Sequence, residues 1–185
     1  MSKMDSKKWW ILSGVIVLII VEIVLFVFNL TELVYYNSLL LIVMVLIFFL
    51  HRIFQLPEIY VFGLIVVGLL NLTGGLVFVE GIRLYDFYFG FVKLDMVIHA
   101  IGSFMAALII YHIISTKFKK ANKEVLLLLA ALSAMGVGAL FEVLELGGYI
   151  FLENNGVGDY LNNALDLFLN LVGILIASLW ISFRK

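Results

Sequence analysis

Long apolar runs constrain what this chain can fold into more than any other feature of its sequence. A helix needs about 20 largely apolar residues to cross the hydrocarbon core of a bilayer. Six runs near this length follow one another along the chain, at residues 9–29, 38–54, 58–79, 95–115, 125–152 and 160–183. They predict an all-α polytopic membrane protein, a bundle of six transmembrane helices with short connections.

The composition agrees with this fold class and excludes several functions. The chain is 64% hydrophobic and 14% charged, whereas a soluble domain is about half apolar and a quarter charged. We expect one integral membrane domain over residues 1–185, and the run at 9–29 has no cleavage pattern after it, so it is predicted to be retained. The absence of cysteine rules out disulfides and thiolate sites. No basic tract indicates a nucleic-acid partner.

The basic residues predict how the bundle lies in the membrane. Only Arg83 and Lys93 fall on one side. The other ten lie at alternate ends of the spans, namely Lys3, Lys7, Lys8, Arg52, Lys117, Lys119, Lys120, Lys123, Arg184 and Lys185. Because cytoplasmic loops carry the excess of positive charge, both termini are predicted to be cytoplasmic. Tyr35 and Tyr36 would then mark the outer interface.

Several ionisable residues lie inside the apolar runs. The most telling are four carboxylates and one imidazole, at Asp95, His99, Glu142, Glu145 and Asp166, and Glu22 is a weaker member. A charged side chain at the centre of a bilayer costs about 2.5–3.5 kcal/mol or more, which makes such residues candidates for a functional site. With the predicted orientation they all lie in the outer half of the bundle.

Helical spacing places these residues on faces that also carry small residues. Positions three or four apart share one face of a helix. Three such faces are Asp95, His99, Gly102 and Ala106; Ala130, Ala134, Gly138, Glu142 and Glu145; and Asp159, Asn163, Asp166, Asn170, Gly173 and Ala177. Small residues mark the sides on which membrane helices approach closely, so the carboxylates are predicted to point inward and to share one site.

A divalent cation would compensate several carboxylates confined in a low dielectric. The expected ligands are Asp95, His99, Glu142 and Asp166, and Glu142 or Glu145 is the expected proton acceptor. The groups expected to bind substrate or to support the ligands are Asn71, Asp159 and Asn170. This donor set suits Mg, Mn, Zn or non-haem Fe, and the sequence does not choose among them. Two other interpretations stay open: polar contacts that only pack helices, and a proton or ion pathway.

The one long external connection, residues 80–94, is rich in aromatic side chains. Its segment 85–91 is too aromatic for a freely solvated loop. One interpretation is an anchor with rings at the level of the lipid headgroups. The other is a lid, or an entrance from the lipid, above the polar site.

Several motifs resemble those of a known family. They are the run at 71–87, Asp95-x-x-x-His99 followed by Gly102, Glu142-x-x-Glu145, Gly158-Asp159, and Asp166-x-x-x-Asn170-x-x-Gly173. Over residues 60–178 they resemble the uncharacterised YjdF-like family of prokaryotic inner-membrane proteins. The resemblance implies a multi-pass protein of the plasma (inner) membrane with its acid and histidine pattern at the positions named above, and it supplies no reaction. Asp-x-x-x-His is also similar to VanZ-like proteins and to membrane-bound metal-dependent hydrolases.

The leading hypothesis is a metal-dependent membrane hydrolase. Its site would open toward the outer leaflet and take a lipid or lipid-linked substrate, with the bound cation lowering the pKa of a water. A small proton- or ion-coupled transporter using the same carboxylates is the first alternative. A non-catalytic membrane partner protein is the second. The sequence fixes neither the substrate nor the oligomeric state.

Overall fold

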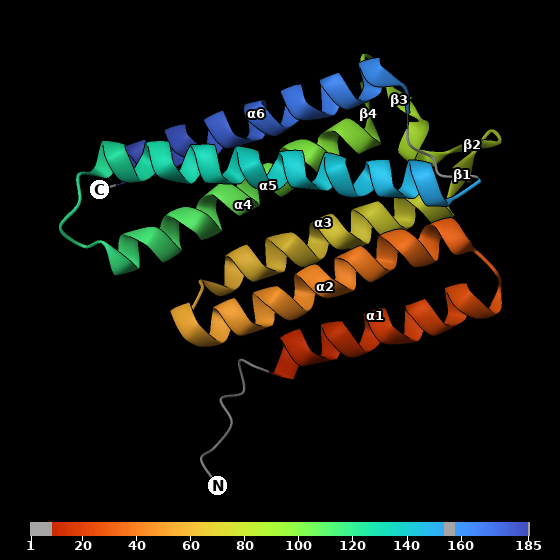
Figure 1. Cartoon of the computed structure of the whole chain (residues 1–185), viewed down its shortest axis with the longest axis horizontal. Helices are drawn as coiled ribbons and strands as arrows, with labels where there is room; N and C mark the ends of the chain where they lie inside the picture. The colour runs from red at the N-terminus through yellow and green to blue at the C-terminus, as the bar shows by residue number, and fades with distance from the viewer. Residues whose placement is uncertain (1–8, 154–157, 185) are drawn as a thin grey trace, which may run out of the picture.

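The computed structural model describes residues 9–153 and 158–184. Six α-helices form within them: α1 (Trp9–Val27), α2 (Thr31–Phe54), α3 (Glu58–Leu76), α4 (Leu94–Lys117), α5 (Lys123–Phe151) and α6 (Tyr160–Phe183). They run roughly parallel to one long axis, and successive connections lie at alternate ends (Figure 1). Helices α2 to α6 are long and apolar enough to cross a membrane, and α1 contains the shorter apolar stretch Leu12–Val27. The predicted all-α polytopic fold is confirmed.

Two helix boundaries differ from the limits of the apolar runs. Helix α2 begins at Thr31 rather than near residue 38, because the polar residues of its first turns are accommodated inside the protein. Glu32 is 8% exposed and Asn37 is 3% exposed, and both have hydrogen-bond partners. Helix α3 ends at Leu76, and the apolar residues that follow it form a short strand. A polar residue with a partner costs little when buried, so hydropathy alone misplaces such ends.

The tightest packing joins α4, α5 and α6. Helices α4 and α6 make the most extensive contact, and α5 packs on both. A Cβ atom on Gly173 of α6 would lie 2.0 Å from the carbonyl oxygen of Ala100 in α4, so these two backbones touch. Away from the hairpins, the core of this three-helix unit is apolar and consists of Ala107, Leu108, Ala134, Ile174, Ala177 and Ile181.

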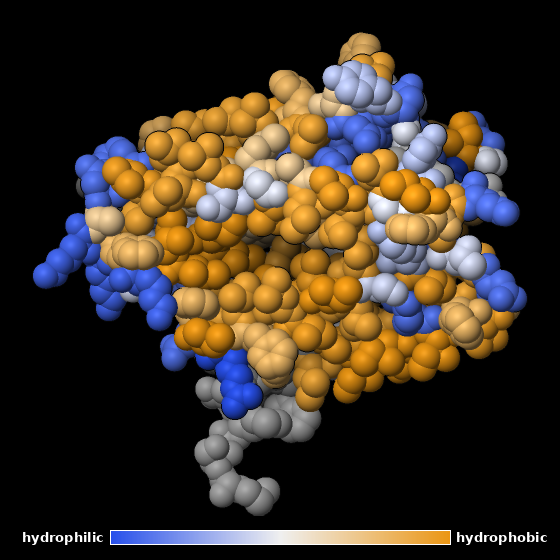
Figure 2. Space-filling view, viewed as in Figure 1, coloured by the Kyte–Doolittle hydropathy of each residue, from blue (hydrophilic) through white to orange (hydrophobic). Residues whose placement is uncertain are grey.

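The outer surface of the bundle is apolar over its middle. Figure 2 shows hydrophobic residues across the centre of one face and hydrophilic residues gathered toward its ends. Large apolar side chains are exposed on several helices, among them Ile23, Phe62, Leu128 and Leu175. Soluble monomers rarely expose so much contiguous apolar surface, whereas a bundle in contact with lipid does so along its whole length.

The connection from α3 to α4 consists of two short antiparallel hairpins around a turn. Strand β1 (Phe78–Val79) pairs with β2 (Ile82–Arg83), β3 (Tyr88–Phe89) pairs with β4 (Val92–Lys93), and the 3-10 turn η2 (Leu84–Asp86) lies between the hairpins. Glu80 and Gly81 have φ of 53° and 82°, and positive φ at both central residues is what a type I′ hairpin turn requires. Gly90, with φ of 71°, begins the second turn.

The two parts of this connection differ in exposure. The tip of the second hairpin points outward, and Phe91 is 99% exposed. The turn η2 instead packs against the bundle, since a Cβ atom on Gly74 would lie 2.7 Å from the Tyr85 ring. The hairpin tip therefore has the exposure of an interfacial anchor, while the η2 turn covers the end of the bundle.

Candidate metal centre and its pocket

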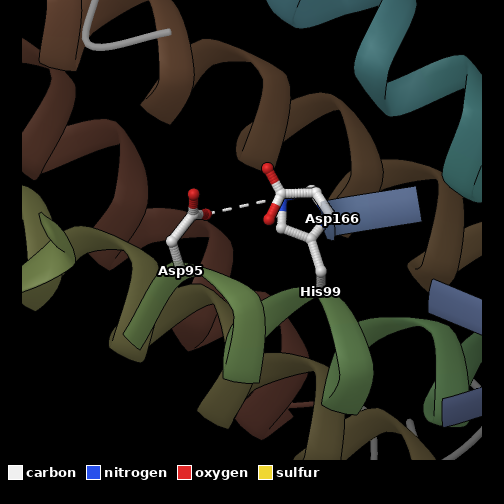
Figure 3. Close-up of side chains that lie close together, drawn as sticks. All are labelled: Asp95, His99 and Asp166. Carbon is white, nitrogen blue, oxygen red and sulfur yellow. Dashed lines mark ion pairs between the residues drawn. The ribbon is translucent and has the colours of Figure 1, made fainter. Parts of the chain in front are cut away.

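Asp95, His99 and Asp166 meet near the hairpin end of the bundle. Asp95 and His99 lie four residues apart on α4, and their side chains approach Asp166 of α6 (Figure 3). One ligand atom from each residue lies within 4.8 Å of the other two. Around a single octahedral ion with bonds of about 2.1 Å, ligand atoms are about 3.0–4.2 Å apart. The three side chains are therefore close to the geometry that one cation would need.

Helix α5 adds two carboxylates, one on each side of the His99 ring. Glu142 Oε1 is 3.4 Å from Nδ1. The other ring nitrogen, Nε2, is 3.5 Å from Asp95 Oδ1 and 3.7 Å from Glu145 Oε1. A neutral His99 with its proton on Nδ1 toward Glu142 would present the lone pair of Nε2 to a cation held beside Asp95 and Glu145.

The acids of the cluster are buried, and some of their oxygens lack hydrogen-bond donors. Asp166 is 0% exposed, Asp95 6% and Glu142 8%. Among the described residues, Asp95 Oδ1, Asp166 Oδ1 and both Glu142 oxygens are buried without a hydrogen-bond partner. Buried polar atoms are nearly always satisfied in folded proteins, because an unpaired one costs the desolvation free energy of the group. These oxygens are thus where a cation or a donor from a ligand would be bound.

Asn162 links two of the acids to a lysine. Its Nδ2 donates to Asp166 Oδ2 at 2.7 Å and lies 3.5 Å from Asp95 Oδ2. Its Oδ1 accepts a hydrogen bond from Lys93 Nζ at 3.3 Å. Lys93 also lies 3.6 Å from Asp86. The ammonium group therefore reaches Asp95 and Asp166 through an intervening amide in this structure.

A pocket opens beside the cluster, where α2, α3 and the hairpin connection meet α4 and α5. Asp95 and Glu145 form part of its wall, together with Tyr36, Asn37 and Asn71. A molecule in this pocket would therefore contact two carboxylates of the cluster directly.

The hairpin connection contributes Arg83 and Tyr85 to this pocket. Both Nη atoms of Arg83 donate to the Glu32 carboxylate, with 2.7 Å between Nη2 and Oε2. This hydrogen bond raises the pKa of the Arg83 guanidinium, which therefore keeps its charge. Burial, and then the nearby Asp95 carboxylate, raise the pKa of the Tyr85 phenol well above its usual value, so the phenol stays a hydrogen-bond donor.

The other residues predicted for the site lie at different distances from the cluster. Asn71 lines the pocket. Asn170 is buried one turn beyond Asp166, and its Oδ1 accepts from Ser103 Oγ at 2.5 Å. Asp159 is exposed and caps α6, accepting from the Asn162 backbone N–H at 2.9 Å. The structure does not bring the Asp159 carboxylate to the cluster, because an N-cap side chain is used by its own helix.

Most of the polar residues that line the pocket are missing from the sequence-based site, among them Glu32, Tyr36 and Asn162. The sequence predicts Tyr35 and Tyr36 as interface markers, yet Tyr36 lines the pocket and the Tyr35 hydroxyl donates to the Leu144 carbonyl at 2.5 Å. The sequence does carry a signal for Asn162. It lies four residues before Asp166, and Asn163 lies three before it, so both asparagines share a helical face with that acid. For Glu32 no signal exists, since its partner Arg83 is 51 residues away in the sequence.

The chain matches the model of one protein family. A family model described as "Predicted membrane protein (DUF2238)" matches residues 8–185. The chain belongs to this family. No curated protein matches it, and no solved structure matches it. DUF2238 is a family of predicted membrane proteins, and the match covers all six helices. The finer resemblances to YjdF-like and VanZ-like proteins stay predictions.

Proposed function

We propose that this protein binds one divalent cation through Asp95, His99 Nε2 and Asp166. The observation that carries the proposal is the meeting of three ligand atoms within 4.8 Å, two of them from buried carboxylates that each hold an oxygen without a hydrogen-bond donor. Carboxylate oxygens and an imidazole nitrogen are ligands that Mg²⁺, Mn²⁺, Zn²⁺ or Fe²⁺ accept. The buried charge of Asp166 supports the same proposal, because no lysine or arginine in the described ranges forms an ion pair with this carboxylate.

The two glutamates of α5 then take different roles. The sequence predicts Glu142 as a ligand and as a catalytic group. Its position beside His99 Nδ1 favours a third role, in which its carboxylate orients the imidazole and makes Nε2 a stronger ligand. Glu145 faces Nε2 and lines the pocket, so we assign proton transfer to Glu145.

The reaction that we propose is hydrolysis of a lipid-linked substrate. When bound, a divalent cation would polarise a bond of the substrate and would lower the pKa of a bound water. The Glu145 carboxylate, in the wall of the pocket, can accept the proton of that water as its oxygen bonds to the substrate, and can then return the proton to the leaving oxygen as the scissile bond breaks. The Tyr85 phenol stays protonated and is hydrogen-bonded to Asp95, so it would help to position this ligand. Transport has less support, because beyond Asn170 the core of α4, α5 and α6 is filled by apolar side chains.

Metal binding is tested on the purified protein in detergent micelles. We expect Mn²⁺, followed by its electron paramagnetic resonance signal, to bind with a stoichiometry of one. His99→Ala should lower the affinity by about 100-fold or more, since loss of a supporting partner alone costs about 10- to 100-fold. His112→Ala is the matched control: it removes a histidine from the same helix whose Nε2 lies 3.2 Å from the Phe54 carbonyl oxygen instead. Equal affinities for the two variants, or no bound Mn²⁺ in the unaltered protein, would refute the site.

Orientation is the second part of the proposal: the hairpin end faces outward from the plasma (inner) membrane of a prokaryote. The distribution of lysines and arginines supports it. Because the chain has no cysteine, single cysteines report on one position each. Phe91→Cys should react with a membrane-impermeant maleimide in intact spheroplasts, and Lys119→Cys only after lysis. The reverse labelling pattern would show that the hairpin end faces the cytoplasm.

A further inference from the structure

We propose that the pocket beside the cluster binds the phosphate group of an amphiphilic substrate, and that Arg83 is its anion-binding residue. The inference rests on the proposed cation site, because the pocket is also lined by carboxylates. Arg83 compensates Glu32 and Lys93 lies 3.6 Å from Asp86, whereas a phosphate would face Asp95 and Glu145 without a cation. The inference adds a substrate class to the proposed hydrolase: lipids that carry a phosphate ester.

Arg83 has binding capacity beyond its pairing with Glu32. A guanidinium has five N–H donors in a planar fork, and the two hydrogen bonds to the Glu32 carboxylate use two of them. The Arg83 side chain is 32% exposed, whereas that of Glu32 is 10% exposed. Glu32 therefore holds the guanidinium from the protein side, while the Arg83 side chain stays partly exposed and keeps three further N–H donors. Fork geometry and weak hydration make arginine well suited to bind phosphate oxygens.

A second observation points to a ligand in the same pocket. Asn37 is 3% exposed, and its amide orientation is fixed, because Nδ2 faces two acceptors: Glu22 Oε2 at 2.5 Å and the Leu18 carbonyl at 3.2 Å. Its Oδ1 consequently has no donor among the described residues, although Asn37 lines the pocket. A hydroxyl on the ligand would satisfy this buried acceptor.

The pocket is also partly apolar. Leu33 and Leu40 of α2 and Leu72 of α3 line it together with the polar groups. A molecule that is complementary to both the polar and the apolar residues of this pocket has a phosphate at one end and a hydrocarbon chain at the other. That combination favours a lipid phosphate over free inorganic phosphate as the natural occupant, since apolar area removed from water adds to the affinity of the lipid alone.

The test compares two variants that break the same ion pair from opposite sides. Arg83→Gln removes the anion-binding group, whereas Glu32→Gln removes the competing carboxylate and keeps one hydrogen-bond acceptor for Arg83. Binding is measured by titration calorimetry on Mn²⁺-saturated protein in micelles. The probes are dihexanoyl phosphatidic acid, inorganic phosphate, and dihexanoylglycerol as the phosphate-free control.

We expect Arg83→Gln to weaken binding of dihexanoyl phosphatidic acid by about 10- to 100-fold, the usual effect of removing charged hydrogen bonds. Glu32→Gln should leave the affinity unchanged or raise it. Inorganic phosphate should bind more weakly than the lipid and show the same order of variants. If both variants weaken binding equally, Arg83 serves only to hold the hairpin, and the inference fails. If dihexanoylglycerol binds as well as the phosphatidic acid, the phosphate has no role and the inference fails as well.

The Mn²⁺ titration separates the two levels of the proposal. Loss of the cation site would remove both the proposed function and the phosphate site that depends on it. A protein that binds Mn²⁺ normally but gives the same phosphatidic acid affinity in both variants would overturn the phosphate site alone.

Discussion

Asp166→Asn is expected to lower the affinity for a divalent cation by at least about 100-fold while the bundle stays folded. The substitution keeps the size of the side chain and an oxygen that can accept from Asn162 Nδ2. It removes a negative charge from a fully buried position that several carboxylates share. Without a cation, the free energy of unfolding should be unchanged or higher, because a buried charge without compensation is costly. Mn²⁺ titration and thermal unfolding in detergent measure the two effects.

Asp159→Asn is the matched control for this experiment. It is the same substitution on the same helix, at an exposed residue that caps α6 and that asparagine can replace. We expect wild-type affinity for Mn²⁺ from this variant. Full affinity in Asp166→Asn would show that the acids serve helix packing and hold no cation.

Gly173→Ala is expected to destabilise the protein by about 3 kcal/mol, at the upper end of the usual cost of overpacking. The new Cβ atom would lie 2.0 Å from the Ala100 carbonyl oxygen and 2.8 Å from its carbonyl carbon. These are backbone atoms of α4, so no side chain can rotate away, and α4 and α6 must separate. The separation should also weaken cation binding, because Asp95 and His99 lie on one of these helices and Asp166 on the other.

Gly136→Ala provides the comparison. This glycine lies within α5, and a Cβ atom there would have nothing within 4 Å. Alanine favours helix over glycine by up to about 1 kcal/mol, so the variant should be as stable as the unaltered protein or slightly more stable. Unfolding in detergent at equal midpoints for both glycine variants would contradict the close contact of α4 and α6.

The candidate site illustrates how far sequence patterns reach. The spacing of Asp95 and His99 predicts one helical face, and the structure has both on the same side of α4. Asp166 is predicted to point inward by the small residues on its face, and it is fully buried. Asp159 satisfies the same spacing rule and yet caps its own helix. Helical periodicity thus gives the face of a residue but not whether a helix end or a neighbouring helix uses its side chain.

The aromatic connection at residues 80–94 shows a limit of predictions that rest on composition. Its composition predicts either an anchor or a lid, and composition cannot separate them because both need aromatic side chains. In the structure the choice differs from residue to residue: Phe91 is exposed at a hairpin tip, while Tyr85 is packed against Gly74 beside the cluster. Two tight turns with positive φ determine which side chains face outward.

The membrane class and the all-α fold are predictable from the sequence alone, and so are the helical faces on which the acids lie. The physical reason is that lipid imposes a local rule, since each span must be apolar and helical on its own. Three contacts follow instead from the packing of the helices. Glu142 and Glu145 lie on opposite sides of His99, Asn162 joins two acids, and Arg83 pairs with Glu32. Those contacts depend on how helices distant in the sequence rotate and approach one another, which is set by side-chain packing between them and leaves no periodic signal along the chain.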